Sequence, residues 1–144
     1  MKEQNYSNHA RLVPGYHFVL APVLLLTCIG SLVNLWKSLG DHQRLYSASL
    51  IVVLSFCCFF IAGYARIFAL KAQDRAIRAE ENLRHYVLAG KPLDPRLTVK
   101  QIVALRFASD GEFVELARRA AEENMDPDAI KRAIRNWRAD HYRV

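Results

Sequence analysis

Two long stretches of this 144-residue chain contain no charged side chain. Residues 12–36 and 45–65 lack Lys, Arg, Asp and Glu, whereas nearly all of the charge follows Arg66. A soluble globular domain spreads its charges more evenly. Each stretch supplies about 20 residues, which is enough for a helix to cross a hydrocarbon core about 30 Å thick. The pattern predicts an all-α membrane protein with two transmembrane helices.

A short polar segment separates the two stretches and predicts a transmembrane hairpin. We expect a juxtamembrane tail at residues 1–15, spans at residues 16–36 and 45–70, and an extracytoplasmic loop at residues 37–44. So short a loop forces the two helices to run antiparallel. Aromatic rings and long basic side chains are favoured at membrane interfaces. The residues expected there are Arg11, Tyr16, Trp36, Arg66 and Lys71.

The second span has no stop signal at its end. Residues 71–89 contain neither Pro nor Gly and are rich in helix-forming residues. We therefore expect the helix to continue as a stalk over residues 71–90, to reach roughly 30 Å from the membrane, and to stop at Gly90.

Three short helices are expected in the remaining segment, residues 91–144, which we call the head. Thr98 and Ser109 each begin a capping-box sequence, and Asp126 precedes a proline at the first helical position. The last helix is expected to bury an apolar stripe made of Ile130, Ala133, Ile134 and Trp137.

The distribution of Lys and Arg predicts the orientation. More basic residues follow the second span than occupy the loop, which places the stalk, the head and both termini in the cytoplasm. The net charge of +6 suits anionic lipid headgroups. Nucleic acid is disfavoured as a partner because the helix after Ser109 is net acidic.

The sequence shows no catalytic residues and no metal site. Its three cysteines lie inside the apolar stretches without metal-binding spacing. His9, His17 and His85 are the candidates for a cofactor site, because histidine is a common haem and metal ligand. The competing interpretation, which we prefer, is that these histidines are interfacial or solvated. No cofactor is predicted.

A regular seam of small residues follows one face of the second span and the stalk. Its members recur alternately every three and four residues, the spacing of a heptad repeat, and small side chains let helices approach closely in lipid. The seam consists of Ala62, Ala65, Ala69, Ala72, Ala76, Ala79, Leu83 and Tyr86. It continues backwards through Cys58, Ser55, Ile51 and Ala48.

Two kinds of partner remain open for this seam. A second copy of the chain or another membrane protein could cover it. Alternatively, it packs within one chain, with the first span docking through Ala21, Cys28 and Ser31 and the head docking on the stalk.

Several short motifs together resemble an uncharacterised bacterial family, domain-of-unknown-function family 6526, over essentially the full length. They are Gln4-Asn5-Tyr6, Asn8-His9, Arg11, Pro14, His17, Gln73-Asp74-Arg75, Gly90-Lys91, the run from Ala104 to Asp110, Ile130-Lys131 and Trp137-Arg138-Ala139-Asp140. The resemblance implies a bacterial membrane protein with two spans, and it transfers no catalytic residue. We expect the protein in the bacterial inner membrane.

The sequence thus predicts a membrane-anchored helical interaction protein, either a scaffold or an accessory subunit. A small oligomeric channel or transporter-like assembly is the first alternative. A membrane enzyme or haem-binding subunit is the second.

Overall fold

The structure, a computed structural model, describes residues 4–9 and 11–141. It divides into two compact units. The hairpin unit contains residues 12–69, and the head unit contains the described residues of the N-terminal tail together with everything described from Leu70 onward. All regular elements in these described parts are helices.

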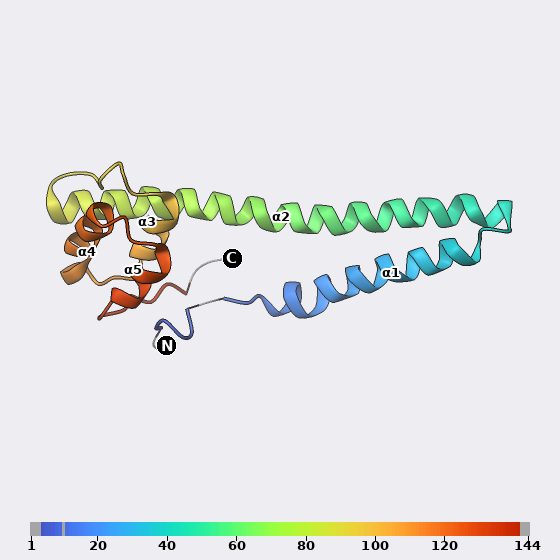
Figure 1. The fold of residues 1–144 in the computed structure, drawn as a ribbon, viewed down its shortest axis with the longest axis horizontal. Coiled ribbons are helices and arrows are strands. Elements are labelled where there is room, and N and C mark those ends of the chain that lie inside the picture. The colour runs from blue at the N-terminus through green and yellow to red at the C-terminus, as the bar shows by residue number, and fades with distance from the viewer. Residues whose placement is uncertain (1–3, 10, 142–144) are drawn as a thin grey trace. The chain divides into compact units, whose positions relative to one another are not determined.

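The hairpin unit consists of two antiparallel helices (Figure 1). A π-helical segment, η1 (Gly15–Leu20), leads directly into α1 (Ala21–Lys37), and a short turn connects α1 to α2 (His42–Ala89). The Asp41 carboxylate accepts hydrogen bonds from the Gln43 and Arg44 amides at 3.0 and 3.3 Å and thereby caps the start of α2. Both helical segments are long and apolar enough to cross a membrane.

A proline explains the π-helical start of the first span. The amide of Ala21 donates to the carbonyl of Tyr16, five residues back. The next residue, Pro22, has no amide hydrogen and cannot continue a regular α-helical ladder from the preceding turn. The wider π turn before Pro22 accommodates this missing hydrogen bond.

Small side chains lie between the two hairpin helices, and large apolar ones face outward. Cys28, Ser31, Ala48 and Ser55 are buried although this unit contains only these two helices. Large apolar residues of both helices remain exposed, including Leu26, Ile61 and Phe68. This arrangement reverses the usual pattern of a water-soluble protein and is typical of helix packing in lipid. The docking of the first span through Cys28 and Ser31 agrees with the intramolecular alternative, whereas Ala21 is only half-buried.

The helix α2 continues without interruption into the head unit, as the sequence predicted, and ends at Ala89. Gly90 has a φ of +70° and so occupies the left-handed conformation that favours glycine at a helix end. The Gly90 amide donates to the Tyr86 carbonyl at 2.8 Å. The last part of α2, from Leu70, forms one side of the head unit (Figure 1).

Three short helices and their connections build the core of the head. These are α3 (Val99–Leu105), α4 (Asp110–Glu122) and α5 (Pro127–Ala133). Their largest fully buried side chains are Leu105, Phe107, Phe113 and Ile130. The predicted capping box at Thr98 forms with Gln101, and the Asp126 carboxylate caps α5 by accepting from the Asp128 and Ala129 amides, both at 2.8 Å.

The predicted capping box at Ser109 is wrong. Ser109 occupies the N-cap position of α4, but its side chain makes no capping hydrogen bond. Its amide, which Glu112 would bind in a capping box, donates instead to the Asn136 carbonyl at 3.0 Å. The Glu112 carboxylate accepts from the Arg135 and Asn136 amides at 3.1 and 3.0 Å. Tertiary partners have therefore replaced the local ones.

The same contacts shorten the last helix, which the apolar spacing in the sequence predicted as far as Trp137. The helix α5 ends at Ala133, and Ile134 already has an extended conformation. Because Arg135 and Asn136 donate their amides to Glu112, these residues leave the helical ladder. Trp137 then pairs with Ala108 in an isolated β-bridge. Ile130 and Ile134 are buried as expected, but Trp137 is only half-buried.

Candidate functional site: a charged junction of tail, stalk and head

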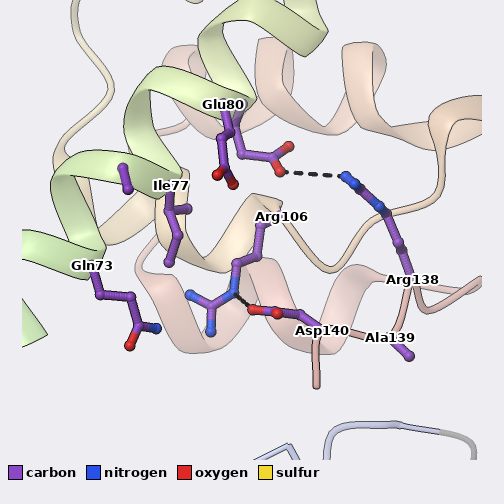
Figure 2. Close-up of a pocket in the computed structure, with 9 residues that line it drawn as sticks. Gln73, Ile77, Glu80, Arg106, Arg138, Ala139 and Asp140 are labelled. Atoms are coloured by element: carbon purple, nitrogen blue, oxygen red, sulfur yellow. Dashed lines mark hydrogen bonds and ion pairs between the residues drawn. The ribbon is translucent and has the colours of Figure 1, made fainter. Parts of the chain in front are cut away.

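An extended C-terminal segment organises the site. It follows α5 and lies along the residues that connect α3 to α4. The Arg138 amide donates to the Phe107 carbonyl at 2.7 Å. The Trp137 and Phe107 rings pack with their centroids 5.0 Å apart. This pairing brings Arg138 and Asp140 to the stalk side of the head, where they meet residues of α2 (Figure 2).

The N-terminal tail is part of the same site. The His9 ring packs on both Phe107 and Trp137, with centroid distances of 5.9 Å in each case. Its Nδ1 atom lies 2.6 Å from the Tyr6 carbonyl oxygen. Gln4 is buried, and its Oε1 atom accepts from the Asp140 amide at 2.8 Å.

Two further tail residues contact the head through polar groups. The Tyr6 hydroxyl donates to Asp128 at 2.7 Å and accepts from the Arg132 guanidinium at 3.0 and 3.1 Å. The Tyr6 hydrogen bond, together with the positive charge of Arg132, lowers the pKa of Asp128. Arg11 donates to the His141 carbonyl at 2.6 Å. The tail is thus held to the head over most of its described length.

A network of ion pairs ties the stalk to the head. Arg84 on α2 donates to Glu81 at 2.9 Å, to Asp110 at 2.7 Å and to the Ala108 carbonyl at 2.7 Å. Its guanidinium lies 4.3 Å from the centroid of the Phe113 ring. Glu81 is 4% exposed. Because water is largely excluded from Glu81 and Arg84, their ion pair is stable only if both side chains are fully hydrogen-bonded. Arg84 meets this condition through its bonds to Glu81, Asp110 and the Ala108 carbonyl.

Two further ion pairs complete the junction. The Arg106 side chain, at the end of α3, is buried, and its Nε atom lies 2.9 Å from Asp140. Its guanidinium also packs 4.3 Å from the Phe107 ring centroid. Arg138 lies 3.4 Å from Glu81. The C-terminal segment therefore contacts both the stalk and α3 through charged side chains.

An open cavity of about 310 Å³ lies between these ion pairs. Figure 2 shows Gln73, Ile77 and Glu80 on one wall, facing Arg106 and Asp140 across it. Among the described residues, those that line the cavity supply three carboxylates and two guanidinium groups, but no histidine, cysteine or serine. This arrangement can hold elements together and bind a polar group through hydrogen bonds. It places no nucleophile beside a base.

The three candidate histidines have separate contacts. His9 lies in the aromatic cluster described above. His85 is buried, with Nδ1 2.7 Å from the Lys91 carbonyl and its ring against Phe113. His17 belongs to the hairpin unit, where its Nδ1 atom lies 3.0 Å from both the amide and the carbonyl of Val13. Within the described residues no group of three His, Cys, Asp or Glu side chains could hold a metal ion.

The expected interface residues fall into both units. Tyr16 donates to the Ala62 carbonyl at 3.0 Å, and the Arg66 guanidinium lies 5.7 Å from the Tyr16 ring centroid. These two residues thus occupy the same end of the hairpin. Trp36, at the loop end, is exposed, and so is Lys71. Arg11 and Lys71 both belong to the head unit.

The seam is covered only in part. Its continuation at Ala48 and Ser55 is buried within the hairpin, and Ala62 and Ala69 are half-buried. All its other members from Ala65 onward are exposed in the single chain. The head does pack on the stalk, but through a neighbouring face that includes Ile77, Glu81 and His85.

Sequence reasoning missed the docking of the tail. No periodicity marks residues 4–9, and their long-range partners are about 100 or more residues away. One signal was available, because the motifs that carry the family resemblance include both sides of the contact. Gln4 and His9 are in those motifs, and so are their partners Phe107, Trp137 and Asp140.

The fold and the junction together define an all-helical protein with two helices of membrane-spanning length and a head fixed by the N-terminal tail. The chain belongs to the family of unknown function DUF6526, whose family model matches residues 1–144. Neither a curated protein nor a solved structure matches the chain.

Proposed function

We propose that this protein is a membrane-anchored interaction protein of the bacterial inner membrane, serving as a scaffold or accessory subunit. The hairpin is the anchor, and the head with its docked tail is the binding module on the cytoplasmic side. The observation that carries the proposal is a head with its own buried core at the end of a helix of spanning length.

The surface of the hairpin supports insertion into a bilayer. Leu26, Ile61 and Phe68 are each more than 60% exposed in the single chain. Exposing a continuous surface of this kind to water costs roughly 25 cal/mol for each Å². Lipid removes that cost, and the basic residues of the stalk favour the cytoplasmic side.

The buried hydroxyls of the hairpin favour close helix packing over a water-filled pore. Ser31 donates to the Cys28 carbonyl at 2.8 Å, and Ser55 donates to the Ile51 carbonyl at 2.7 Å. Both hydroxyls are satisfied within their own helices. These hydroxyls belong to the helix interface of one chain and do not supply the polar pore lining that the channel alternative needs between copies.

Site-specific photo-crosslinking in cells tests this function. A photoreactive residue placed at Glu115, Arg119 or Arg135, all exposed on the head, should yield a discrete adduct with another polypeptide. The same residue at Ile61 should yield only lipid adducts. Phe113→Ala removes a fully buried ring and is expected to unfold the head, so it should abolish the head adduct and leave the lipid adduct unchanged.

The opposite outcome is equally clear. If no head position gives a protein adduct, the interaction role is wrong, and a stoichiometric chromophore or small molecule in the purified protein would point to its replacement. A membrane enzyme or haem-binding subunit would then be the better description.

A further inference from the structure

The stalk exposes an apolar helix face that the head leaves uncovered. Leu83, Tyr86 and Val87 are 64%, 57% and 75% exposed, although they lie beyond the spanning-length apolar stretch. Ala72, Ala76 and Ala79 continue this face and are also exposed. We call these six residues the stalk face.

The spacing of the stalk face is that of a coiled coil. With Ala76 and Leu83 at a positions, Ala72, Ala79 and Tyr86 occupy d positions, and Val87 is the flanking e residue. A strict seven-residue repeat keeps one face of a helix against a supercoiled partner. The packing of α2 on its own head does not require a repeat of this kind on the stalk face.

The head occupies the other side of the same helix. Its buried stalk contacts, Ile77, Glu81 and His85, fall at b, f and c positions of this register, and so does Arg84, at b. These are the outward-facing positions of a coiled coil. Residues at flanking positions also border the head. Asn82, at g, accepts a hydrogen bond from the Leu93 amide, and the e residues Gln73 and Glu80 line the junction cavity. The a and d residues of the stalk face nevertheless stay exposed beside the docked head and are available to a second helix.

Charge complementarity identifies the occupant of the stalk face. Arg75 is a g residue, and Glu80 is the e residue that follows it five positions later. In a parallel pair of identical helices in register, Arg75 of each chain lies beside Glu80 of the other, so two opposite-charge pairs flank the seam. Both residues are exposed in the single chain. An antiparallel pair would not produce this match.

We propose that the stalk face binds a second copy of this chain as a parallel, two-stranded coiled coil. This inference rests on the proposed membrane anchorage, because two chains inserted with the same topology present their stalks in parallel. Confinement in one membrane also raises the effective concentration of the partner helix. Each dimer would then carry two heads on the outer sides of a shared stalk.

Disulfide cross-linking of the full chain in membranes tests the dimer. In a background of Cys28→Ala, Cys57→Ala and Cys58→Ala, a single cysteine at Ala79 or Leu83 should form a disulfide-linked dimer on oxidation. A cysteine at Arg78, which is exposed at an outward c position, is the matched control and should give none. Equal cross-linking at Arg78, or none at both Ala79 and Leu83, would overturn the proposal.

A charge exchange tests the register. Arg75→Glu places like charges in both flanking pairs and should cause loss of the Leu83 cross-link. Adding Glu80→Arg restores two opposite-charge pairs and should restore it. If the double variant cross-links no better than Arg75→Glu alone, the parallel register is wrong.

The two proposals fail separately. A chain that remains in the membrane and gives head adducts, but shows no stalk cross-link, disproves the dimer alone. A stalk cross-link without any head adduct disproves the interaction role of the head and leaves the dimer intact.

Discussion

At the scale of single residues, Glu81 is the side chain on which the junction depends most. It is buried on the stalk and contacts both Arg84 and Arg138. Arg84 in turn contacts Asp110 and the Ala108 carbonyl, so one carboxylate connects α2 with the start of α4 and with the C-terminal segment. Without Glu81, Arg84 keeps Asp110 and the Ala108 carbonyl as partners, but one of its largely buried N–H groups loses its acceptor.

We therefore expect Glu81→Ala to destabilise the head by about 1–3 kcal/mol. The measurement is denaturant unfolding of the purified chain, followed by Trp137 fluorescence in a Trp36→Phe background. Glu115→Ala is the matched control, because its ion pair with Arg118 is solvent-exposed, and it should change stability little. Equal effects of the two variants would show that the buried network does not hold the head on the stalk.

Asp128 should make the docking of the tail dependent on pH. Its pKa is lowered below 3.8, mainly by the Tyr6 hydroxyl and then by Arg132. Because docking lowers this pKa, the ionised carboxylate stabilises the docked tail fully at pH values above the ordinary pKa of 3.8. The contribution is lost as the pH falls through the lowered pKa.

Trp137 emission in the Trp36→Phe background measures this effect, because the His9 ring of the docked tail lies against Trp137. Asp128→Asn should shift the emission to longer wavelength at neutral pH, and the two spectra should converge as the pH falls below 3.8. Identical spectra at neutral pH would rule out a role of Asp128 in holding the tail.

At the scale of elements, the end of α2 depends on the conformation of one glycine. Gly90 has a φ of +70°, and a Cβ atom there would meet nothing within 4 Å. Gly90→Ala therefore tests backbone strain without a steric clash, and it should cost about 1 kcal/mol of head stability.

Gly111→Ala is the control for this change. Gly111 lies in the first turn of α4, also with nothing within 4 Å of an added Cβ and without a positive φ. Alanine there should be neutral or stabilise the head by about 0.4–1 kcal/mol. Thermal unfolding of both variants gives the comparison, and similar losses of stability would remove the special role of Gly90.

The elements that sequence reasoning predicted well are those with local causes. The long α2 follows from a run without helix breakers, and the caps at Thr98 and Asp126 need only neighbouring residues. The errors at Ser109 and at the end of α5 have a long-range cause, because Glu112 binds amides more than 20 residues away. Helix propensity could not reveal that competition.

At the scale of the whole molecule, the tail constrains the topology. Tail residues and the head belong to one compact unit, and two helices of spanning length separate them along the chain. If both helices cross the membrane, the tail and the head must lie on the same side. The basic residues of the stalk predict the same arrangement, with tail and head on one side of the membrane. The contacts between tail and head are an independent physical reason to expect it.

The two-span topology is tested most directly by the accessibility of single cysteines in intact cells. In the chain without native cysteines, one cysteine is placed at Ser7 in the tail, at Gly40 in the loop or at Arg119 in the head, and a membrane-impermeant maleimide is applied. We predict that Gly40→Cys is labelled from outside, and that Ser7→Cys and Arg119→Cys are labelled only after the membrane is permeabilised. Labelling of tail and head from opposite sides, or of loop and head from the same side, would contradict the two-span hairpin with a tail-bound head.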